Sequence, residues 1–400
     1  MSDRAPPPAR LLDLTRLVSR AGRRDTGVDR VEAAYLERLL SERVPLFGLV
    51  RTALGYLLLD GWACAGIAER RAGKPRGKAG PLGRALRRGH PDRADEEALL
   101  RRQALARAAP PLLGAMLTRH LPRGAVYLNT GHTNLSRATM KGLKATPGLR
   151  VATLIHDTIP LDFPQYQRVG TEERFRDFLI RAWHVSDLLI ANSQKTEDDL
   201  RRHLAVLGPM PEIVTALLGV PRPDPGHAPE GPWTGQPYFV ALGTIEPRKN
   251  HRLLLDLWDK LGAEAPPLLI VGQRGWADDR LLARLDARPP QVFELGALGD
   301  AESFALLRDA AGLLFPSHAE GFGLPPVEAA ALGCPVIASD LPVLRESLGD
   351  IPVYASVNHL YLWENAVREL TRAQARGDRQ PVPYDPPDWD AHFNTVLRRV

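Results

Sequence analysis

Cysteine is scarce in this chain of 400 residues, which has only Cys64 and Cys334. The two lie far apart and form no metal-ligand spacing, which excludes a zinc knuckle and a disulfide framework. We therefore expect a reducing compartment. The first ten residues, MSDRAPPPAR, have no apolar stretch behind their charges, so we expect no secretory signal.

Long hydrophobic runs are also missing. The longest apolar tract, residues 44–68, is interrupted by Arg51 and Asp60. Its pieces are well short of the roughly 20 residues that span a bilayer. They predict a strand, a turn and a strand, PLFGLVRT followed by GYLLLD. We expect a cytoplasmic protein, either free or peripheral on the inner face of the plasma membrane.

Positive charge is concentrated in one segment. The whole chain carries a net charge of +5, and residues 69–102, the basic segment, contain eleven Lys and Arg against five Asp and Glu. This segment is either a solvated insertion or a patch for an anionic membrane surface or an anionic acceptor. No aromatic residue interleaves its charges, so we expect no nucleic-acid partner.

Outside the basic segment, short apolar runs such as RVATLIHD and PPLLIVGQ alternate with helical patterns. This alternation predicts parallel sheets covered by helices, in two doubly wound α/β domains. A Pro- and Gly-rich stretch separates the halves. The expected parts are a first domain over residues 1–222, a linker over 223–236, a second domain over 237–386 and a terminal helix within 387–400. Whether that helix crosses back to the first domain stays open.

In open α/β sheets, ligands bind outside the carboxyl ends of the strands. With two such domains, we expect the site in the cleft between them. The residues that directly follow predicted strands are therefore candidates, and they include Thr130 to Asn134, His156, Asp157, Asn192, Ser193, Gly243, Thr244, Gly272, Gly296 and Ser317 to Gly323.

The strongest pattern is SHAEGFGLPPVEAAALG, a strand end followed by a glycine turn and a helix start. Gly321 and Gly323, with Phe322 and Leu324, bring backbone N–H groups close to a phosphate. Glu320 and Glu328 stand on either side of this turn. Carboxylates accept hydrogen bonds from sugar hydroxyls, so the pair suits a ligand with sugars at both ends and phosphate between them.

A second pattern, VALGTIEPRKNH, follows another strand. Gly243 and Thr244 end that strand, and Arg248 and Lys249 follow in a short loop. Two cations at a strand end suit a diphosphate.

Weaker candidates lie in the first half. His156 and Asp157 follow a buried strand, and His132 and Asn134 follow its neighbour on the expected acceptor side. Gly27 precedes an amphipathic helix, where it cradles a phosphate or simply makes a turn. By contrast, Asn192 and Ser193 are interpreted mainly as a helix cap.

Together these patterns resemble family 4 of the retaining glycosyltransferases, whose fold is called GT-B. Glu320 and Glu328 match its paired glutamates, with seven residues between them. The resemblance implies that Glu320 holds the donor hexose and Glu328 the ribose. It also implies that Lys249 and Arg248 hold the diphosphate, with His156 beside the hexose. Many members have Arg where this chain has Thr244, which shifts phosphate charge onto Arg248.

The implied activity is transfer of a hexose, with retention and without metal or cofactor, from a nucleotide sugar, GDP-mannose before UDP-glucose. The implied acceptor is a glycan or lipid-linked oligosaccharide of a surface polysaccharide. One alternative keeps the fold, as a nucleotide-sugar epimerase or a phosphorylase. Another is a non-enzymatic protein that binds membrane or nucleic acid through the basic segment.

Overall fold

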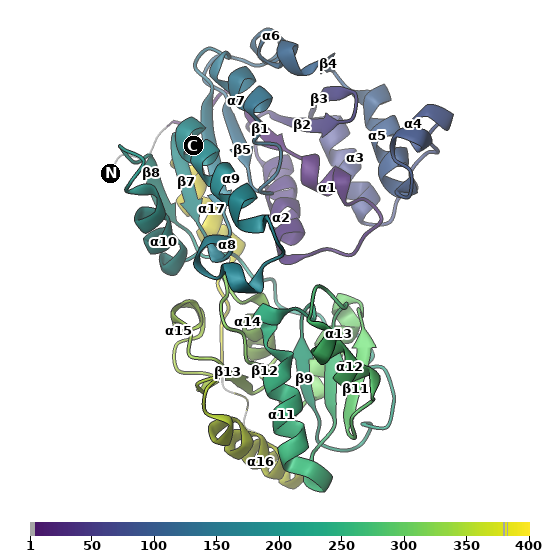
Figure 1. Ribbon diagram of the computed structural model, residues 1–400. Coiled ribbons are helices and arrows are strands. Elements are labelled where there is room, and N and C mark those ends of the chain that lie inside the picture. The colour runs from purple at the N-terminus through teal and green to yellow at the C-terminus, as the bar shows by residue number, and fades with distance from the viewer. Residues whose placement is uncertain (1–4, 379–380, 382) are drawn as a thin grey trace.

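The computed structural model describes residues 5–378, 381 and 383–400. Residues 1–4 of the expected first domain and residues 379, 380 and 382 of the expected second domain lie outside the described residues. Figure 1 shows two α/β domains, one above the other. The predicted pair of doubly wound domains is confirmed.

The first domain is built on an eight-stranded sheet. In spatial order its strands are β4 (Ala106–Ala108), β3 (Gly55–Leu59), β2 (Leu46–Thr52), β1 (Arg10–Asp13), β5 (Val126–Asn129), β6 (Arg150–Ile155), β7 (Leu188–Ala191) and β8 (Glu212–Thr215). The sheet is parallel except at one edge, where β3 pairs antiparallel with both β2 and β4. The strand, turn and strand predicted for PLFGLVRT and GYLLLD are confirmed as β2 and β3. The tight turn between β2 and β3 forces this reversal, whereas parallel neighbours need a long crossover.

The second domain has a six-stranded sheet that is parallel throughout. Its spatial order is β11 (Val292–Gly296), β10 (Leu268–Val271), β9 (Phe239–Leu242), β12 (Gly312–Phe315), β13 (Val336–Ala338) and β14 (Val353–Tyr354). Strands such as β10, LLIV, are buried along their whole length. Continuous apolar runs of this kind suit a sheet that helices cover on both faces.

Helices pack on both sheets, and the packing buries apolar residues on each face. Those of the first domain are α1 (Thr15–Ser19), α2 (Gly27–Ser41), α3 (Gly61–Arg71), α4 (Pro81–Leu86), α5 (Pro91–Gln103), α6 (Leu113–His120), α7 (Arg137–Lys144), α8 (Ile159–Asp162), α9 (Thr171–Val185) and α10 (Gln194–Leu204). Those of the second are α11 (His251–Leu261), α12 (Asp279–Asp286), α13 (Asp300–Asp309), α14 (Leu324–Ala331), α15 (Pro342–Leu348) and α16 (Leu360–Arg376). Short 3₁₀ turns occur at Pro110–Leu112, Pro164–Tyr166, Pro247–Lys249 and Gly262–Glu264.

The basic segment is not a featureless insertion. It includes the end of α3, all of α4 and most of α5. Arg70 is buried and its guanidinium meets the Glu96 carboxylate at 2.7 Å. No helix in the described part of the chain has both the length and the hydropathy needed to cross a membrane.

We propose residues 223–236 as the linker, because the chain between β8 and β9 forms no helix or strand. The last helix, α17 (Trp389–Leu397), lies among the elements of the first domain (Figure 1). His392 joins it to α2 through a hydrogen bond between its Nε2 and the Tyr35 hydroxyl, at 2.8 Å. We therefore propose that residues 387–400 cross back to the first domain.

The protonation of His392 follows from its surroundings. Its Nδ1 lies 3.0 Å from the Leu217 carbonyl oxygen, so Nδ1 carries the proton and Nε2 accepts from Tyr35. Burial lowers the pKa of His392 to about 4. The ring is therefore neutral at pH 7.

Tyr35→Phe should lower the free energy of unfolding by about 1–3 kcal/mol, because it leaves the buried Nε2 of His392 without a donor. Denaturant titration at pH 7 measures the change. Tyr361→Phe is the matched control, since Tyr361 is 64% exposed. Equal stability of the two variants would contradict the assignment.

Candidate functional site

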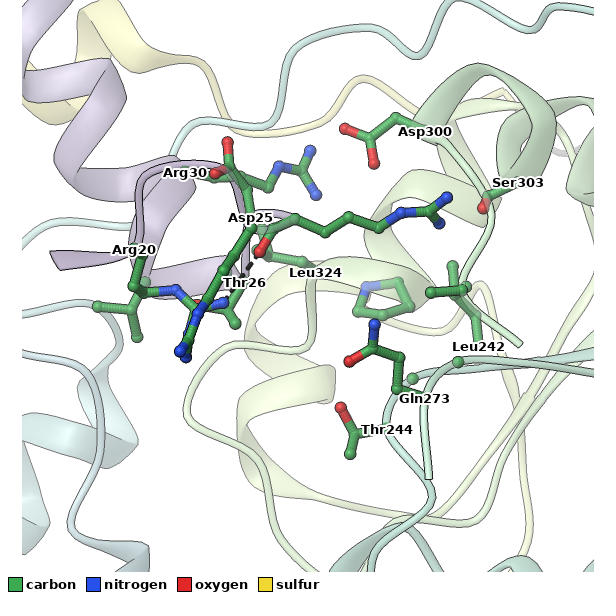
Figure 2. Close-up of a pocket in the computed structure, with 18 of the residues that line it drawn as sticks. Arg20, Asp25, Thr26, Arg30, Leu242, Thr244, Gln273, Asp300, Ser303 and Leu324 are labelled. Atoms are coloured by element: carbon green, nitrogen blue, oxygen red, sulfur yellow. Dashed lines mark hydrogen bonds between the residues drawn. The ribbon is translucent and has the colours of Figure 1, made fainter. Parts of the chain in front are cut away.

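A cleft of about 900 Å³ lies between the two domains. Half of the residues predicted from strand ends line it, together with the five other candidates. The lining candidates are Gly27, His156, Asp157, Asn192, Gly243, Thr244, Arg248, Lys249, Gly272, Glu320, Gly321, Phe322, Gly323, Leu324 and Glu328. Figure 2 shows Thr244, Gln273 and Asp300 from the second domain facing Arg20 and Thr26 from the first.

Glu320 is the centre of a compact ion cluster. Its Oε1 lies 2.7 Å from Lys249 Nζ and 2.7 Å from Arg248 Nη1. Burial by itself raises the pKa of Glu320, but the two cations outweigh it and lower the pKa to about 2. A carboxylate held ionised in this way accepts hydrogen bonds from hydroxyl groups at any physiological pH.

Arg248 holds neighbouring loops together, because each of its known contacts is to a group of the protein. Its guanidinium also pairs with Glu246 at 2.7 Å and donates to the Ala319 carbonyl at 2.6 Å. The expectation that Arg248 bears extra phosphate charge therefore finds little support. Lys249 makes fewer such contacts: besides its ion pair with Glu320, its Nζ lies 4.4 Å from the centroid of the Phe315 ring.

His156 meets the glycine turn from the opposite domain. A Cβ at Gly321 would lie 2.3 Å from the His156 carbonyl oxygen, so only glycine fits at this contact. The His156 ring Nε2 is 2.7 Å from the Thr130 carbonyl oxygen, which makes it the donor. Burial lowers the pKa of His156 to about 4, so the ring is neutral and its Nδ1 is an acceptor.

Beside His156, the pKa of Asp157 is raised to about 6 by burial, although Arg248 opposes the shift. Ser193 is the N-cap of α10, as expected, and accepts from the Thr196 N–H. Its hydroxyl also donates to the Gly321 carbonyl at 3.3 Å, so the cap contributes to the domain contact.

The predicted residues that do not line the cleft are Thr130, Gly131, His132, Thr133, Asn134, Ser193, Gly296, Ser317, His318 and Ala319. The Nε2 of His132 accepts from the His156 N–H at 3.0 Å, and the Asn134 amide donates to the buried Asp13 carboxylate at 2.6 Å. Both residues thus position the strand-end loops, and we do not retain them as acceptor-side residues. Gly296, at the end of β11, does not line the cleft, but the next residue, Ala297, does.

Glu328 is buried and pairs across the cleft with Arg30 of α2, at 2.6 Å. Burial raises the pKa of Glu328, and Arg30 opposes the shift. Gly27, at the start of α2, approaches Leu324 so closely that an added Cβ would lie 3.1 Å from its Cδ1. Gly27 therefore also serves the packing of the two domains.

Sequence reasoning missed a group of arginines on the first-domain wall. They are Arg20, Arg23, Arg24, Arg30, Arg70, Arg71 and Arg76. A signal was present, because SRAGRRD follows the first strand closely and the basic segment contains the last three. Only the fold shows that these two stretches face the same cleft.

Two segments of the chain match known families. Residues 227–351 match glycosyl transferases group 1, and residues 129–207 match the N-terminal domain of glucosyltransferase 3-like proteins. Serotype-specific mannosyltransferase WbdA of Escherichia coli is 32% identical over 213 residues, which are 48% of this chain and 26% of that protein. O-antigen chain mannosyltransferase B of Escherichia coli is 31% identical over 224 residues, 52% of this chain and 58% of that protein.

Among solved structures, HepE of Anabaena in complex with UDP and glucose has a TM-score of 0.60 at 14% identity, over 98% of this chain and 95% of that one. WaaG, a glycosyltransferase involved in lipopolysaccharide biosynthesis, has a TM-score of 0.50 at 15% identity, over 97% and 99%. These likenesses show the fold, which is GT-B.

Gly321→Ala should disturb the contact between the domains, because its methyl group would collide with the His156 backbone. We expect a loss of about 1–3 kcal/mol in stability, as for other overpacked contacts, or a wider separation of the domains. Thermal unfolding and small-angle X-ray scattering measure the two effects. Gly80→Ala is the control, since nothing lies within 4 Å of its added Cβ. If both variants behave like the wild type, the close contact is wrong.

Proposed function

Starting from a group 1 glycosyl transferase segment within a GT-B fold, we propose that this protein is a retaining hexosyltransferase. It transfers a sugar from a nucleotide sugar to a glycan or lipid-linked acceptor in surface polysaccharide synthesis. The observation that carries the proposal is Glu320, an ionised carboxylate held beside Lys249 in the interdomain cleft.

Mannose is the favoured sugar and GDP-mannose the favoured donor. Support comes from the relatives named as mannosyltransferases, each of which the chain matches over part of its length. UDP-glucose is the alternative. We propose that the reaction uses no resident metal or cofactor.

The donor is assigned to the second-domain wall. Glu320 accepts hydrogen bonds from hydroxyls of the donor hexose. Lys249 and the N–H groups of Gly323 and Leu324, where α14 begins, face the diphosphate, since the next two residues are prolines without an N–H. Glu328 takes the ribose hydroxyls, and to do so it must release Arg30, its present partner. His156, neutral and buried, lies on the hexose side.

Charge that develops on the departing nucleotide is what the site stabilises. As the bond between the anomeric carbon and the phosphate oxygen breaks, Lys249 and the α14 start meet the growing negative charge. The acceptor oxygen forms the new bond on the same face, and its proton passes to the leaving phosphate. Arg248 contributes indirectly, because it holds the loops of Glu320 and Lys249 in place.

The membrane partner is proposed for α4. This helix exposes Leu82 (68%) and Leu86 (41%), and Lys78, Arg84 and Arg88 around them are exposed as well. Apolar side chains beside cations suit an anionic lipid surface. Other cations of the basic segment, such as Arg87 with Glu97, are paired within the protein.

Lys249→Met and Glu320→Gln should each reduce mannose transfer from GDP-mannose by about 10²–10³-fold. The first removes the cation that faces the leaving diphosphate, and the second removes the carboxylate that positions the donor hexose. Lys260→Met and Glu172→Gln, on exposed surface ion pairs, are the matched controls. NMR of the product gives the anomeric configuration, and circular dichroism shows that the variants fold.

A thermal-shift titration belongs to the same test. A nucleotide that binds only the folded protein raises its melting temperature. We expect GDP to raise it more than UDP does, and we expect a smaller rise in Lys249→Met.

Wild-type rates in both active-site variants would contradict the site. Interconversion of two donor sugars without transfer would indicate an epimerase, and release of a sugar phosphate from a glycan with inorganic phosphate would indicate a phosphorylase. Lipid or nucleic-acid binding without turnover would indicate a non-enzymatic protein.

Leu82→Ser combined with Leu86→Ser should abolish binding to vesicles that contain phosphatidylglycerol, since it removes the apolar face of α4. Vesicle co-sedimentation measures this. The control combines Leu54→Ser with Leu112→Ser. These two leucines lie outside the basic segment and are 53% and 60% exposed. If vesicle binding survives the α4 change, α4 is not the membrane contact.

A further inference from the structure

The two walls of the cleft differ in charge. The first-domain wall carries seven arginines and three acidic residues, which are Asp25, Glu96 and Asp157. The second-domain wall carries two basic residues, Arg248 and Lys249, and three acidic ones, Asp300, Glu320 and Glu328. The donor side is thus nearly balanced, whereas the opposite side has a clear excess of positive charge.

Most of the first-domain arginines are already paired. Arg20 pairs with Asp29, Arg30 with Glu328, Arg70 and Arg76 with Glu96, and Arg71 with Asp25. Arg23 and Arg24 differ, because neither meets a carboxylate among the residues that the structure describes. Arg23 donates instead to a neutral acceptor, since its Nη2 lies 3.0 Å from the ring Nδ1 of His90.

The loop that carries these two arginines is held in shape. Arg20 donates to the Arg24 carbonyl at 2.9 Å, and Asp25 is tied to Arg71 of α3. At Gly22 the backbone packs against Asp92 of α5, where an added Cβ would lie 2.2 Å from a carboxylate oxygen. The loop is therefore anchored on two sides, and Arg23 and Arg24 both line the cleft.

We propose that Arg23 and Arg24 bind a phosphate or diphosphate group of the acceptor. The inference rests on the proposed function, which assigns the donor diphosphate to Lys249 and α14 on the opposite wall. Guanidinium groups bind phosphate through paired hydrogen bonds, and an arginine without a carboxylate partner gains most from such an anion. The group belongs either to a lipid diphosphate that carries the growing glycan or to a phosphate on the glycan itself.

The first test is a calorimetric titration with inorganic pyrophosphate while the donor site is saturated with GDP, or with UDP if the protein prefers it. Arg23→Gln combined with Arg24→Gln should weaken pyrophosphate binding by about tenfold or more, the effect of losing about 1.4 kcal/mol. Nucleotide affinity should stay within about twofold of the wild type. The control combines Arg119→Gln with Arg123→Gln, which removes the same charge from exposed positions outside the cleft lining.

Unchanged pyrophosphate binding overturns the proposal. A fall in nucleotide affinity as large as the fall for pyrophosphate also overturns it, because the arginines would then serve the donor. If the protein transfers no sugar but still binds pyrophosphate through these arginines, the proposed function fails while the anion site remains.

A second test separates the two sources of phosphate. The double variant should raise KM for a lipid diphosphate acceptor, with little change in kcat, and leave KM for a neutral glycoside unchanged. An equal rise for a water-soluble phosphoglycoside would assign the contact to a phosphate on the glycan. Equal KM changes for charged and neutral acceptors overturn the proposal.

Discussion

The carboxylate of Glu320, buried between Lys249 and Arg248, is the interaction on which the site depends. It ties the loop after β9 to the loop after β12, two neighbouring strands of the second sheet. Removing one member of a buried ion cluster leaves an uncompensated charge, which is costly. The cluster therefore fixes the glycine turn that follows it, and this turn brings Gly321 against the His156 carbonyl of the other domain.

The same electrostatic argument extends across the cleft. Arg30 and Glu328 form an ion pair between the domains, so the residue proposed for the ribose is occupied before a donor arrives. If Glu328 takes the ribose hydroxyls as proposed, donor binding exchanges one charged partner for several neutral hydroxyls. Arg30 is then released and adds to the positive charge of the first-domain wall. The proposed assignment therefore couples donor binding to the electrostatics of that wall through one contact.

Much of the fold was predictable because apolar runs mark buried strands. The runs PLFGLVRT and PPLLIVGQ became β2 and β10. Strand β4 was missed because three residues, ARA, carry no recognisable pattern. Its pairing depends on β3, whose own direction follows from the turn before it.

The residue types of the donor side were determined by the sequence itself. Glu320, Glu328 and Lys249 follow strands, and parallel strands bring their carboxyl ends to one edge. Tertiary structure alone decided which residues meet across the cleft. The pairing of Glu328 with Arg30 and the hydrogen bonds of His132 and Asn134 depend on contacts between distant segments. So does the place of Arg23 and Arg24, which line the cleft without a carboxylate partner among the described residues. Such contacts arise when segments that are distant in the sequence pack together, within one domain or between the two, and local sequence patterns hold no record of that packing.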